Sequence, residues 1–215
     1  MVIVLLGMPG CGKGTQAELL TKYYNIPHIS TGDLFRKEMA NKTELGVLAQ
    51  SYINNGHFVP DEVSINMLKN RVSMEDCKNG YILDGFPRTI PQADALNSFA
   101  NVDVAILLDI DEEEVRERAM SRRTCDKCGA IYNIHNYASE TCELCGGNLY
   151  IREDAYKTDE RINTYNREAL PLVDYYNKKG ILKVVDQRKY KDSDVEKQIK
   201  NIFNHIVNII GENND

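Results

Sequence analysis

The segment Gly7–Thr15 constrains the fold of this chain more than any other part of the sequence. It reads GMPGCGKGT and stands between an apolar run, Val2–Leu6, and an amphipathic stretch that begins near Thr15. A strand, a glycine loop and a helix in this order can wrap backbone N–H groups around phosphate oxygens, and the helix N-terminus adds partial positive charge. Lys13 then stands where a lysine reaches the β- and γ-phosphates of a nucleotide. The segment predicts a site for a nucleoside triphosphate.

The loop departs from the common phosphate-loop pattern at one position. That pattern places Ser or Thr directly after the lysine to hold magnesium, whereas this chain has Gly14 there and its hydroxyl one residue later, at Thr15. A tight strand-to-helix turn that only needs glycines is the alternative interpretation, but the flanking strand, the helix and the register of Lys13 favour phosphate binding. A dinucleotide-binding G-x-G-x-x-G loop would leave Lys13 without a role.

Composition narrows the class of protein. The 215 residues suffice for one α/β core with small insertions, and 42% are hydrophobic and 27% charged. The formal net charge of −6 disfavours a nucleic-acid partner, which would usually meet a basic face. No apolar run approaches ~18 residues, so we expect no membrane span. We also expect no signal peptide, a cytoplasmic location and a frayed tail at Gly211–Asp215.

Four of the six cysteines form two C-x-x-C pairs, Cys125 with Cys128 and Cys142 with Cys145. In a reducing compartment such pairs indicate a metal site rather than disulfides, and a glycine next to each pair suits the tight turns around an ion. Four thiolates favour a closed tetrahedral zinc site with a structural role. Iron or a redox dithiol remains an alternative. We expect the unpaired Cys77 to be inert.

Apolar runs that alternate with helical stretches predict a parallel sheet covered on both faces. The predicted strands are Val2–Leu6, Ile26–Ile29, Tyr81–Leu83, Val104–Leu108 and Ile181–Val185. Ligands bind such sheets at the carboxyl ends of the strands. The motifs Thr31-Gly32-Asp33, Asp84–Thr89 and Asp109–Asp111 follow those ends. Residues ~31–60 and ~123–156 do not fit the alternation and are predicted to be insertions; the second is too small to bury a core and would need a metal.

Together these motifs resemble the nucleoside monophosphate kinases, and within them the adenylate kinases whose long lid carries zinc. The matching residues run from residue 1 to about 175 and comprise Gly7–Thr15, Ser30–Arg36, Gly56–Glu62, Asp84–Thr89, Gln92, Arg118, Arg122, Arg123, the four paired cysteines, Arg152 and Arg161. The resemblance implies a P-loop NTPase-like fold, with a five-stranded parallel sheet, helices on both faces, a helical insertion that binds the monophosphate, and a small zinc-bearing lid.

The resemblance also implies domain boundaries and an activity. The core would comprise residues 1–29, 60–121 and 158–215, the monophosphate-binding insertion residues 30–59, and the lid residues 122–157. The activity would be reversible transfer of the terminal phosphoryl group from ATP to AMP, giving two ADP, in adenine nucleotide homeostasis. It would require Mg²⁺ with ATP and structural Zn²⁺, and we expect a monomer.

The family's roles carry over onto matching residues on the ATP side. The ATP-binding set would be Gly10, Cys11, Gly12, Lys13, Gly14, Thr15, Arg118 and Arg122. Arg118 would stack on the adenine of ATP. Asp84 would hold magnesium through water, which would compensate for the hydroxyl missing after Lys13.

The AMP side uses residues from both insertions. The AMP-binding set would be Thr31, Arg36, Phe58, Val59, Gly85, Arg88, Gln92, Arg152 and Arg161. Arg36 and Arg88 would grip the phosphate, because guanidinium groups match phosphate oxygens in pairs. Thr31 and Gln92 would read the adenine. The catalytic set would be Lys13, Asp84, Arg88, Arg122, Arg152 and Arg161, the last three closing with the lid, and Arg123 is a weaker candidate.

The lid departs from the family pattern. Thirteen residues separate its cysteine pairs, fewer than usual; a single aspartate, Asp154, stands where two are common; and Arg161 follows Arg152 by two residues fewer than expected. A kinase for UMP, CMP or GMP is the nearest alternative, although Thr31 and Gln92 favour adenine. A non-enzymatic P-loop switch with a zinc-ribbon interaction module would leave Arg36 and Arg88 unexplained.

Overall fold

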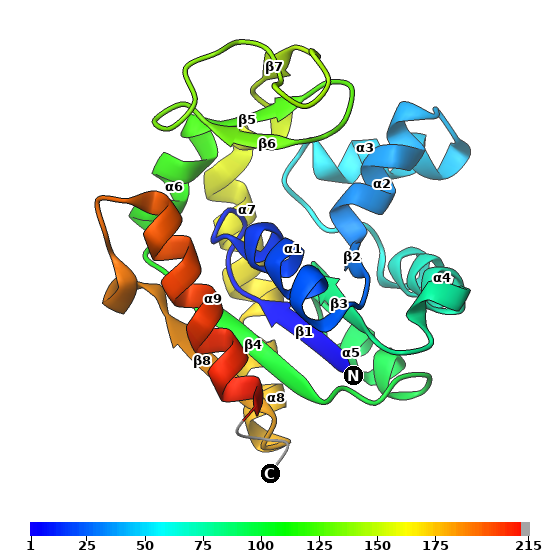
Figure 1. Ribbon diagram of the computed structural model, residues 1–215. Coiled ribbons are helices and arrows are strands. Elements are labelled where there is room, and N and C mark those ends of the chain that lie inside the picture. The colour runs from blue at the N-terminus through cyan, green and yellow to red at the C-terminus, as the bar shows by residue number, and fades with distance from the viewer. Residues whose placement is uncertain (212–215) are drawn as a thin grey trace.

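The structure is a computed structural model that describes residues 1–211, so most of the tail expected to fray lies outside it. Within this range the core is a parallel five-stranded sheet with strand order β2-β3-β1-β4-β8 (Figure 1). The strands are β1 (Val2–Leu6), β2 (His28–Ser30), β3 (Tyr81–Asp84), β4 (Val104–Asp109) and β8 (Leu182–Asp186). All five predicted strands are present, with ends that match or differ by at most two residues, and the predicted fold class is confirmed.

Helices cover both faces of this sheet because alternate strand residues point to opposite sides. Ile3 and Leu5 of β1 pack with α1 (Lys13–Tyr24) and α9 (Val195–Gly211), whereas Val4 and Leu6 belong to a separate apolar cluster on the other face. That second cluster includes residues of α4 (Asp61–Val72), α5 (Ile90–Asn97) and α8 (Pro171–Lys178). Both faces of the central strands β1, β3 and β4 are therefore buried, which explains why their sequences read as continuous apolar runs.

The segment between β2 and α4 folds into two helices that pack on each other, α2 (Thr31–Ala40) and α3 (Glu44–Ile53). Each helix begins with a side-chain cap: Ser30 accepts a hydrogen bond from the Asp33 amide, and Thr43 accepts one from the Gly46 amide. A small apolar cluster of Phe35, Ala49 and Val59 lies beneath the helices, so this insertion has a core of its own.

The cysteine-bearing insertion is a small antiparallel sheet that projects above the core (Figure 1). It consists of β5 (Arg122–Cys125), β6 (Ile131–Asn133) and β7 (Leu149–Tyr150), with β5 in the centre. α6 (Glu112–Ser121) leads directly into β5. The chain returns to the core through η2 (Glu153–Lys157), α7 (Thr158–Thr164) and the π-helical turn η3 (Tyr165–Ala169).

Shorter elements complete the described chain: the 3₁₀ turns η1 (Glu75–Cys77) and η4 (Gln187–Tyr190) precede β3 and α9. Among residues 1–211, no helix combines the length and the apolar character needed to cross a lipid bilayer.

The buried hydroxyl of Tyr176 gives a test of the packing between α8 and the sheet. The residue is 1% exposed, and its hydroxyl has no hydrogen-bond partner among the described residues. A buried polar group without a partner is costly, so we expect Tyr176→Phe to raise the free energy of unfolding by about 1 kcal/mol in urea denaturation.

The neighbouring tyrosine is the matched control. The Tyr175 hydroxyl donates to Asp94 at 2.8 Å and accepts from Asn97 at 2.6 Å, so Tyr175→Phe is expected to lower stability by about 1 kcal/mol. A Tyr176→Phe protein that loses as much stability as Tyr175→Phe would contradict this account of the packing.

Candidate active site

The glycine loop after β1 has the geometry of a phosphate cradle. Gly7, Gly10 and Gly12 all have positive φ, and a Cβ on Gly7 would lie 2.6 Å from the Leu108 carbonyl oxygen. The backbone can therefore turn sharply and present its amides to one point at the N-terminus of α1. The Lys13 ammonium donates to the carbonyl oxygens of Gly7 and Met8, at 2.8 Å each, and so lies folded over the loop.

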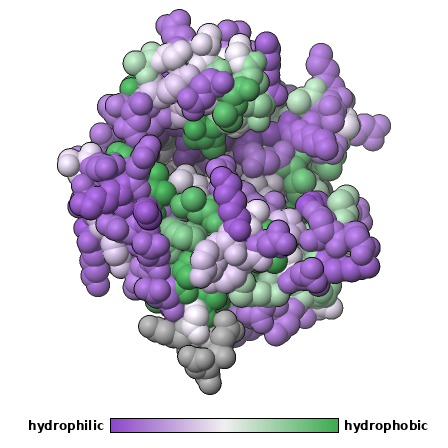
Figure 2. Space-filling view, in the orientation of Figure 1, coloured by the Kyte–Doolittle hydropathy of each residue, from purple (hydrophilic) through white to green (hydrophobic). Residues whose placement is uncertain are grey.

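A cavity of about 290 Å³ opens from this loop across the carboxyl ends of the strands, where the space-filling view is hollowed beneath the lid (Figure 2). Most of the residues predicted from the sequence line it. They are Gly10, Gly12, Lys13, Gly14, Thr15, Thr31, Arg36, Phe58, Val59, Asp84, Gly85, Arg88, Gln92, Arg122, Arg152 and Arg161. The structure therefore brings the loop, the α2–α3 insertion, the Asp84–Gln92 segment and the lid arginines around one space.

Two of the residues predicted to bind ATP do not line the cavity. The Cys11 side chain is fully buried beneath the loop, with its sulfur 3.5 Å from the Lys13 ammonium. Arg118 stays outside because its guanidinium donates to the Cys11 carbonyl oxygen at 3.2 Å and to Glu114 at 2.6 Å. Gln187 also donates to the Cys11 carbonyl oxygen, at 2.9 Å. In this conformation Cys11 and Arg118 support the loop from behind.

At the far end of the cavity, hydrogen bonds to one carbonyl organise the side chains. The Gly85 carbonyl oxygen accepts from the Thr31 hydroxyl at 2.8 Å and from Arg88 Nε at 2.7 Å. The Arg88 guanidinium carbon lies 5.0 Å from the centre of the Phe58 ring, in a cation–π contact. These two contacts hold the Arg88 guanidinium, which also lines the cavity.

Within residues 1–211, five arginines line this cavity: Arg36, Arg88, Arg122, Arg152 and Arg161. Burial lowers the pKa of Arg88, Arg122 and Arg161, and neighbouring arginines lower each further; the pKa of Arg161 falls to about 10. With Lys13, these guanidinium groups outnumber the carboxylates that also line the cavity, which are Glu18, Asp33, Asp84 and Asp154. The cavity is therefore suited to a polyanion.

Asp154 lies among the lid arginines. Its carboxylate pairs with Arg152 and, at 3.1 Å, with Arg161, and the residue is 6% exposed. Burial alone would raise the pKa of Asp154, but Arg161 and Arg152 bring it below the ordinary value. The shortened spacing between Arg152 and Arg161 is therefore compatible with both guanidinium groups meeting at one carboxylate.

Asp84 lies between the loop and the acceptor-side arginines. Its Oδ2 atom lies 3.4 Å from His28 Nε2 and 3.8 Å from the place a Cβ would occupy on Gly14. Burial works to raise the pKa of Asp84, but the neighbouring His28 ring and the charges of Lys13 and Arg88 lower it below the ordinary value. An ionised carboxylate beside a phosphate loop is a suitable oxygen donor for Mg²⁺.

Some residues around the cavity were not predicted from the sequence. Ser64 lines the acceptor end, Tyr165 lines the loop end, and Asp61 bonds to Gln92 from outside. Asp61 belongs to the Gly56–Glu62 motif, which contributed to the family resemblance but did not indicate the hydrogen-bond partner of the Asp61 carboxylate.

Polar side chains join the α2–α3 insertion to the base of the lid. Asn54 donates to Glu153 at 3.1 Å, and His57 Nε2 lies 3.3 Å from a carboxylate oxygen of Glu160. Both contacts are exposed, so the insertion meets the base of the lid here through polar groups rather than through an apolar interface.

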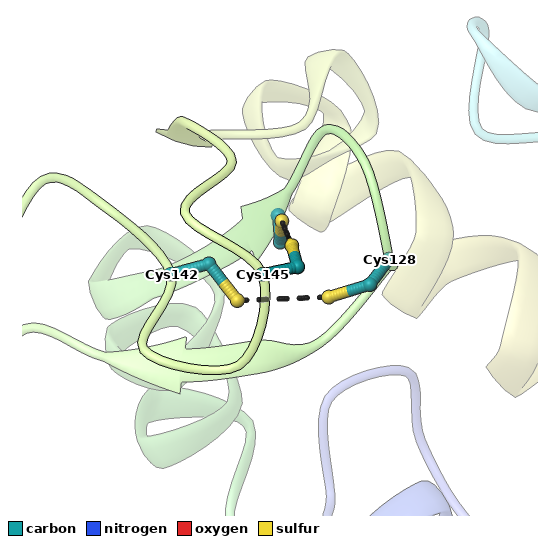
Figure 3. A group of neighbouring side chains, drawn as sticks. Cys128, Cys142 and Cys145 are labelled. Carbon is teal, nitrogen blue, oxygen red and sulfur yellow. Dashed lines mark hydrogen bonds between the residues drawn. The ribbon is translucent and has the colours of Figure 1, made fainter.

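The four lid cysteines form a compact cluster. Their sulfurs lie within 4.8 Å of one another, with Cys125 and Cys145 3.4 Å apart and Cys128 and Cys142 3.6 Å apart. Figure 3 shows Cys128 and Cys142 reaching toward each other from two turns. Four thiolates at bonds of about 2.3 Å around zinc would stand about 3.8 Å apart, so the cluster could hold this ion.

Glycines shape the two turns that carry these cysteines. Gly129 and Gly146 have positive φ, and their amides donate to the carbonyl oxygens of Cys125 and Cys142. A Cβ on Gly147 would lie 2.6 Å from the Cys125 sulfur. Gly129 and Gly146 are therefore favoured by their backbone conformation, and Gly147 by the lack of space beside the Cys125 sulfur.

The fold and the cavity define a class of protein: a P-loop phosphotransferase, with a phosphate loop facing a second set of phosphate-binding arginines. A family model described as adenylate kinase matches residues 5–181. The chain belongs to the adenylate kinase family, which confirms the resemblance seen in the motifs.

Relatives named adenylate kinase are similar over nearly their whole length. The protein from Clostridium tetani (strain Massachusetts / E88) is 46% identical, covering 98% of this chain and 99% of its own. That from Clostridium beijerinckii (strain ATCC 51743 / NCIMB 8052) is 45% identical, covering 99% and 100%. A third, from Clostridium acetobutylicum, is 44% identical with the same coverage.

The buried Asp154 predicts a pH-dependent stability. Because its pKa is lower in the folded protein than in the unfolded chain, its contribution is present at neutral pH and is lost as the pH falls below the ordinary value of 3.8. We expect Asp154→Asn to lower the free energy of unfolding by about 3 kcal/mol at pH 7, because it leaves the charges of Arg152 and Arg161 uncompensated.

Thermal melts between pH 3 and pH 7 check this expectation. The gap in melting temperature between wild type and Asp154→Asn should stay constant from pH 7 to pH 5 and narrow below about pH 4. Glu153→Gln, which removes an exposed neighbouring carboxylate, is the control and should show a small gap. A constant gap down to pH 3 would show that folding does not lower the pKa of Asp154.

Proposed function

We propose that this chain catalyses the reversible transfer of the terminal phosphoryl group of ATP to AMP, giving two ADP, and so serves adenine nucleotide homeostasis. The observation that carries the proposal is the charge around one cavity: Lys13 and the loop amides at one end, and Arg36 and Arg88 at the other. A protein that binds or hydrolyses a single nucleotide has no use for the second set. Membership of the adenylate kinase family supports this reaction.

The donor would bind at the phosphate loop. The amides of Gly10–Thr15 and the Lys13 ammonium would hold the β- and γ-phosphates, with Lys13 exchanging its loop carbonyls for phosphate oxygens. Cys11 would contribute only its backbone. Arg118, whose guanidinium lies against the loop, would have to turn outward to reach the adenine of ATP.

The acceptor would bind under the α2–α3 insertion. Arg36 and Arg88 would hold the AMP phosphate, while Thr31, Phe58, Val59, Gly85 and Gln92 would enclose its sugar and base. Arg152 and Arg161 would reach the same phosphate from the lid side. The contact between Arg88 and Phe58 would change little when AMP binds, because the hydrogen bond from Arg88 Nε to Gly85 already fixes the direction of the guanidinium.

Transfer between the two needs alignment and charge neutralisation rather than a covalent intermediate. Lys13, Arg88, Arg122, Arg152 and Arg161 would surround the transferring group and stabilise its negative charge. Mg²⁺ bound with ATP would neutralise phosphate charge, and Asp84 would hold it through water. The lid strands above the cavity would keep water away from the phosphoryl group.

This assignment gives the chain three parts: a core of residues 1–29, 60–121 and 158–215, an acceptor-binding insertion at residues 30–59, and a lid at residues 122–157. The separate apolar cluster of the insertion and the separate lid sheet support the division. The lid cysteines would hold structural Zn²⁺, and we expect a cytoplasmic monomer, consistent with free thiols in a reducing compartment.

An acceptor panel tests the function. ADP formation from ATP is measured with AMP, UMP, CMP and GMP in turn, and AMP is expected to be the best acceptor by at least a hundredfold in kcat/KM. Preference for another monophosphate would replace the proposed acceptor, and no transfer to any of the four would revive the P-loop switch.

Arg88→Ala should reduce kcat/KM for AMP by about a thousandfold without unfolding the chain, because a phosphate-binding guanidinium is lost.

Removal of zinc tests the role of the cysteines. The lid has little apolar core, so we expect chelation to lower the melting temperature markedly while kcat at a temperature well below melting changes by less than about threefold. Cys77→Ser, which leaves the lid intact, should respond to the chelator as wild type does. Metal analysis before and after chelation identifies the ion, and unchanged melting after its removal would refute a structural role.

A further inference from the structure

Hydrogen bonds hold both ends of the Gln92 side-chain amide. Its Nε2 donates to Asp61 Oδ1 at 2.7 Å, and its Oε1 accepts from the Arg88 backbone amide at 2.8 Å. The residue is 1% exposed, and its backbone amide donates to the Thr89 hydroxyl at 3.3 Å, which anchors the first turn of α5. Gln92 nevertheless lines the cavity, so a rigid amide faces the acceptor end.

These bonds select one of the two orientations that an amide can adopt. A flipped Gln92 would place Oε1 against the Asp61 carboxylate and its NH₂ group against the Arg88 amide N–H. Both contacts would then pair like with like, acceptor with acceptor and donor with donor. Asp61 cannot adapt by turning, because its other oxygen accepts from the Thr89 hydroxyl at 2.9 Å.

The fixed orientation leaves one Nε2 hydrogen and one Oε1 lone pair side by side. Adenine presents a matching pair, an amino donor at C6 next to a ring-nitrogen acceptor, and a Gln amide reads such an edge with two bonds. Hypoxanthine and guanine reverse the pair along their N1 edge, with an oxygen at C6 and an N–H at N1. Only the flipped amide would match them.

We propose that Asp61 is a specificity-determining positioning residue: by holding the Gln92 amide in one orientation it makes the acceptor pocket accept 6-aminopurines and reject 6-oxopurines. The inference rests on the proposed function, because it assumes a purine monophosphate at this end of the cavity. Asp61 is absent from the described residues that line the cavity, so it acts through Gln92 rather than on the ligand.

The position of Asp61 suits this role. It is the first residue of α4, whereas Gln92 belongs to α5, so their bond ties two elements that are separate in sequence. Asp61 is partly exposed and bonds to hydroxyl and amide groups, not to a cation, in the contacts described here. The groups that bond to Asp61 are uncharged donors, so the position needs a hydrogen-bond acceptor rather than a negative charge. An asparagine could accept from Gln92 through its oxygen while its NH₂ group donates to the Thr89 hydroxyl.

The experiment compares AMP with IMP, which differ at the 6-position and N1 but not at C2. For wild type, Asp61→Ala and Asp61→Asn, kcat/KM is measured for each acceptor with saturating ATP. Asp61→Ala is expected to lower the AMP-to-IMP ratio of kcat/KM by about tenfold, within the range known for loss of one two-bond base contact. The KM for ATP and the kcat at saturating AMP should stay within about twofold of wild type.

The conservative variant and a control separate positioning from stability. Asp61→Asn should retain at least half of the wild-type ratio, because its oxygen still accepts from Gln92. Glu62→Ala, which removes the exposed carboxylate next along the first turn of α4, should leave the ratio unchanged. If Asp61→Ala does not fold, Asp61→Ser, whose hydroxyl is too short to reach Gln92, replaces it with the same expected tenfold change.

The outcomes are distinct. A wild-type enzyme that does not phosphorylate AMP would overturn the proposed function itself. An enzyme that phosphorylates AMP, but whose AMP-to-IMP ratio is the same in wild type and in Asp61→Ala or Asp61→Ser, would overturn only the role of Asp61. An equal fall for both acceptors counts as that second result, because it would show a structural effect without discrimination.

Discussion

Mutual repulsion among the cavity arginines is the constraint on which the rest of this architecture depends. Arg36 comes from α2, Arg88 from the loop after β3, Arg122 from the start of β5 and Arg161 from α7. Neighbouring arginines lower the pKa of Arg88, Arg122 and Arg161, which reflects the repulsion among them. The guanidinium groups stay close because different parts of the fold carry them and because the Asp154 carboxylate pairs with Arg152 and Arg161.

The two insertions hold their arginines in place by different means. The α2–α3 insertion has capped helices and an apolar cluster around Phe35, which fix Arg36 and the turn at Phe58. The lid has a three-stranded sheet and four neighbouring thiols, and its glycines at 129 and 146 bend the chain around the sulfurs. The parallel sheet supplies the common floor, since the loop after β1 and the Asp84–Arg88 loop emerge at the same edge.

The sequence predicted the strands, the phosphate loop and the cysteine cluster because each is encoded by local pattern: apolar runs, glycine spacing and C-x-x-C pairs. Through a family resemblance that the comparisons bear out, it also predicted most of the residues that meet around the cavity, although Cys11 and Arg118 do not line it. It did not predict that Cys11 would face inward, that Asp154 would join two arginines, or that Asp61 would hold Gln92. Those contacts join residues far apart in the chain or depend on side-chain direction, and no local pattern records either.

The bridge between Asn54 and Glu153, with His57 beside Glu160, has a consequence for turnover. Exposed polar pairs contribute little net free energy, because water competes for the same groups and salt screens them. The contact that they form between the α2–α3 insertion and the base of the lid is therefore weak compared with a packed apolar interface. The insertion and the lid can separate at this contact at little cost in free energy, and the cavity can open there without disturbing either apolar core or the lid sheet.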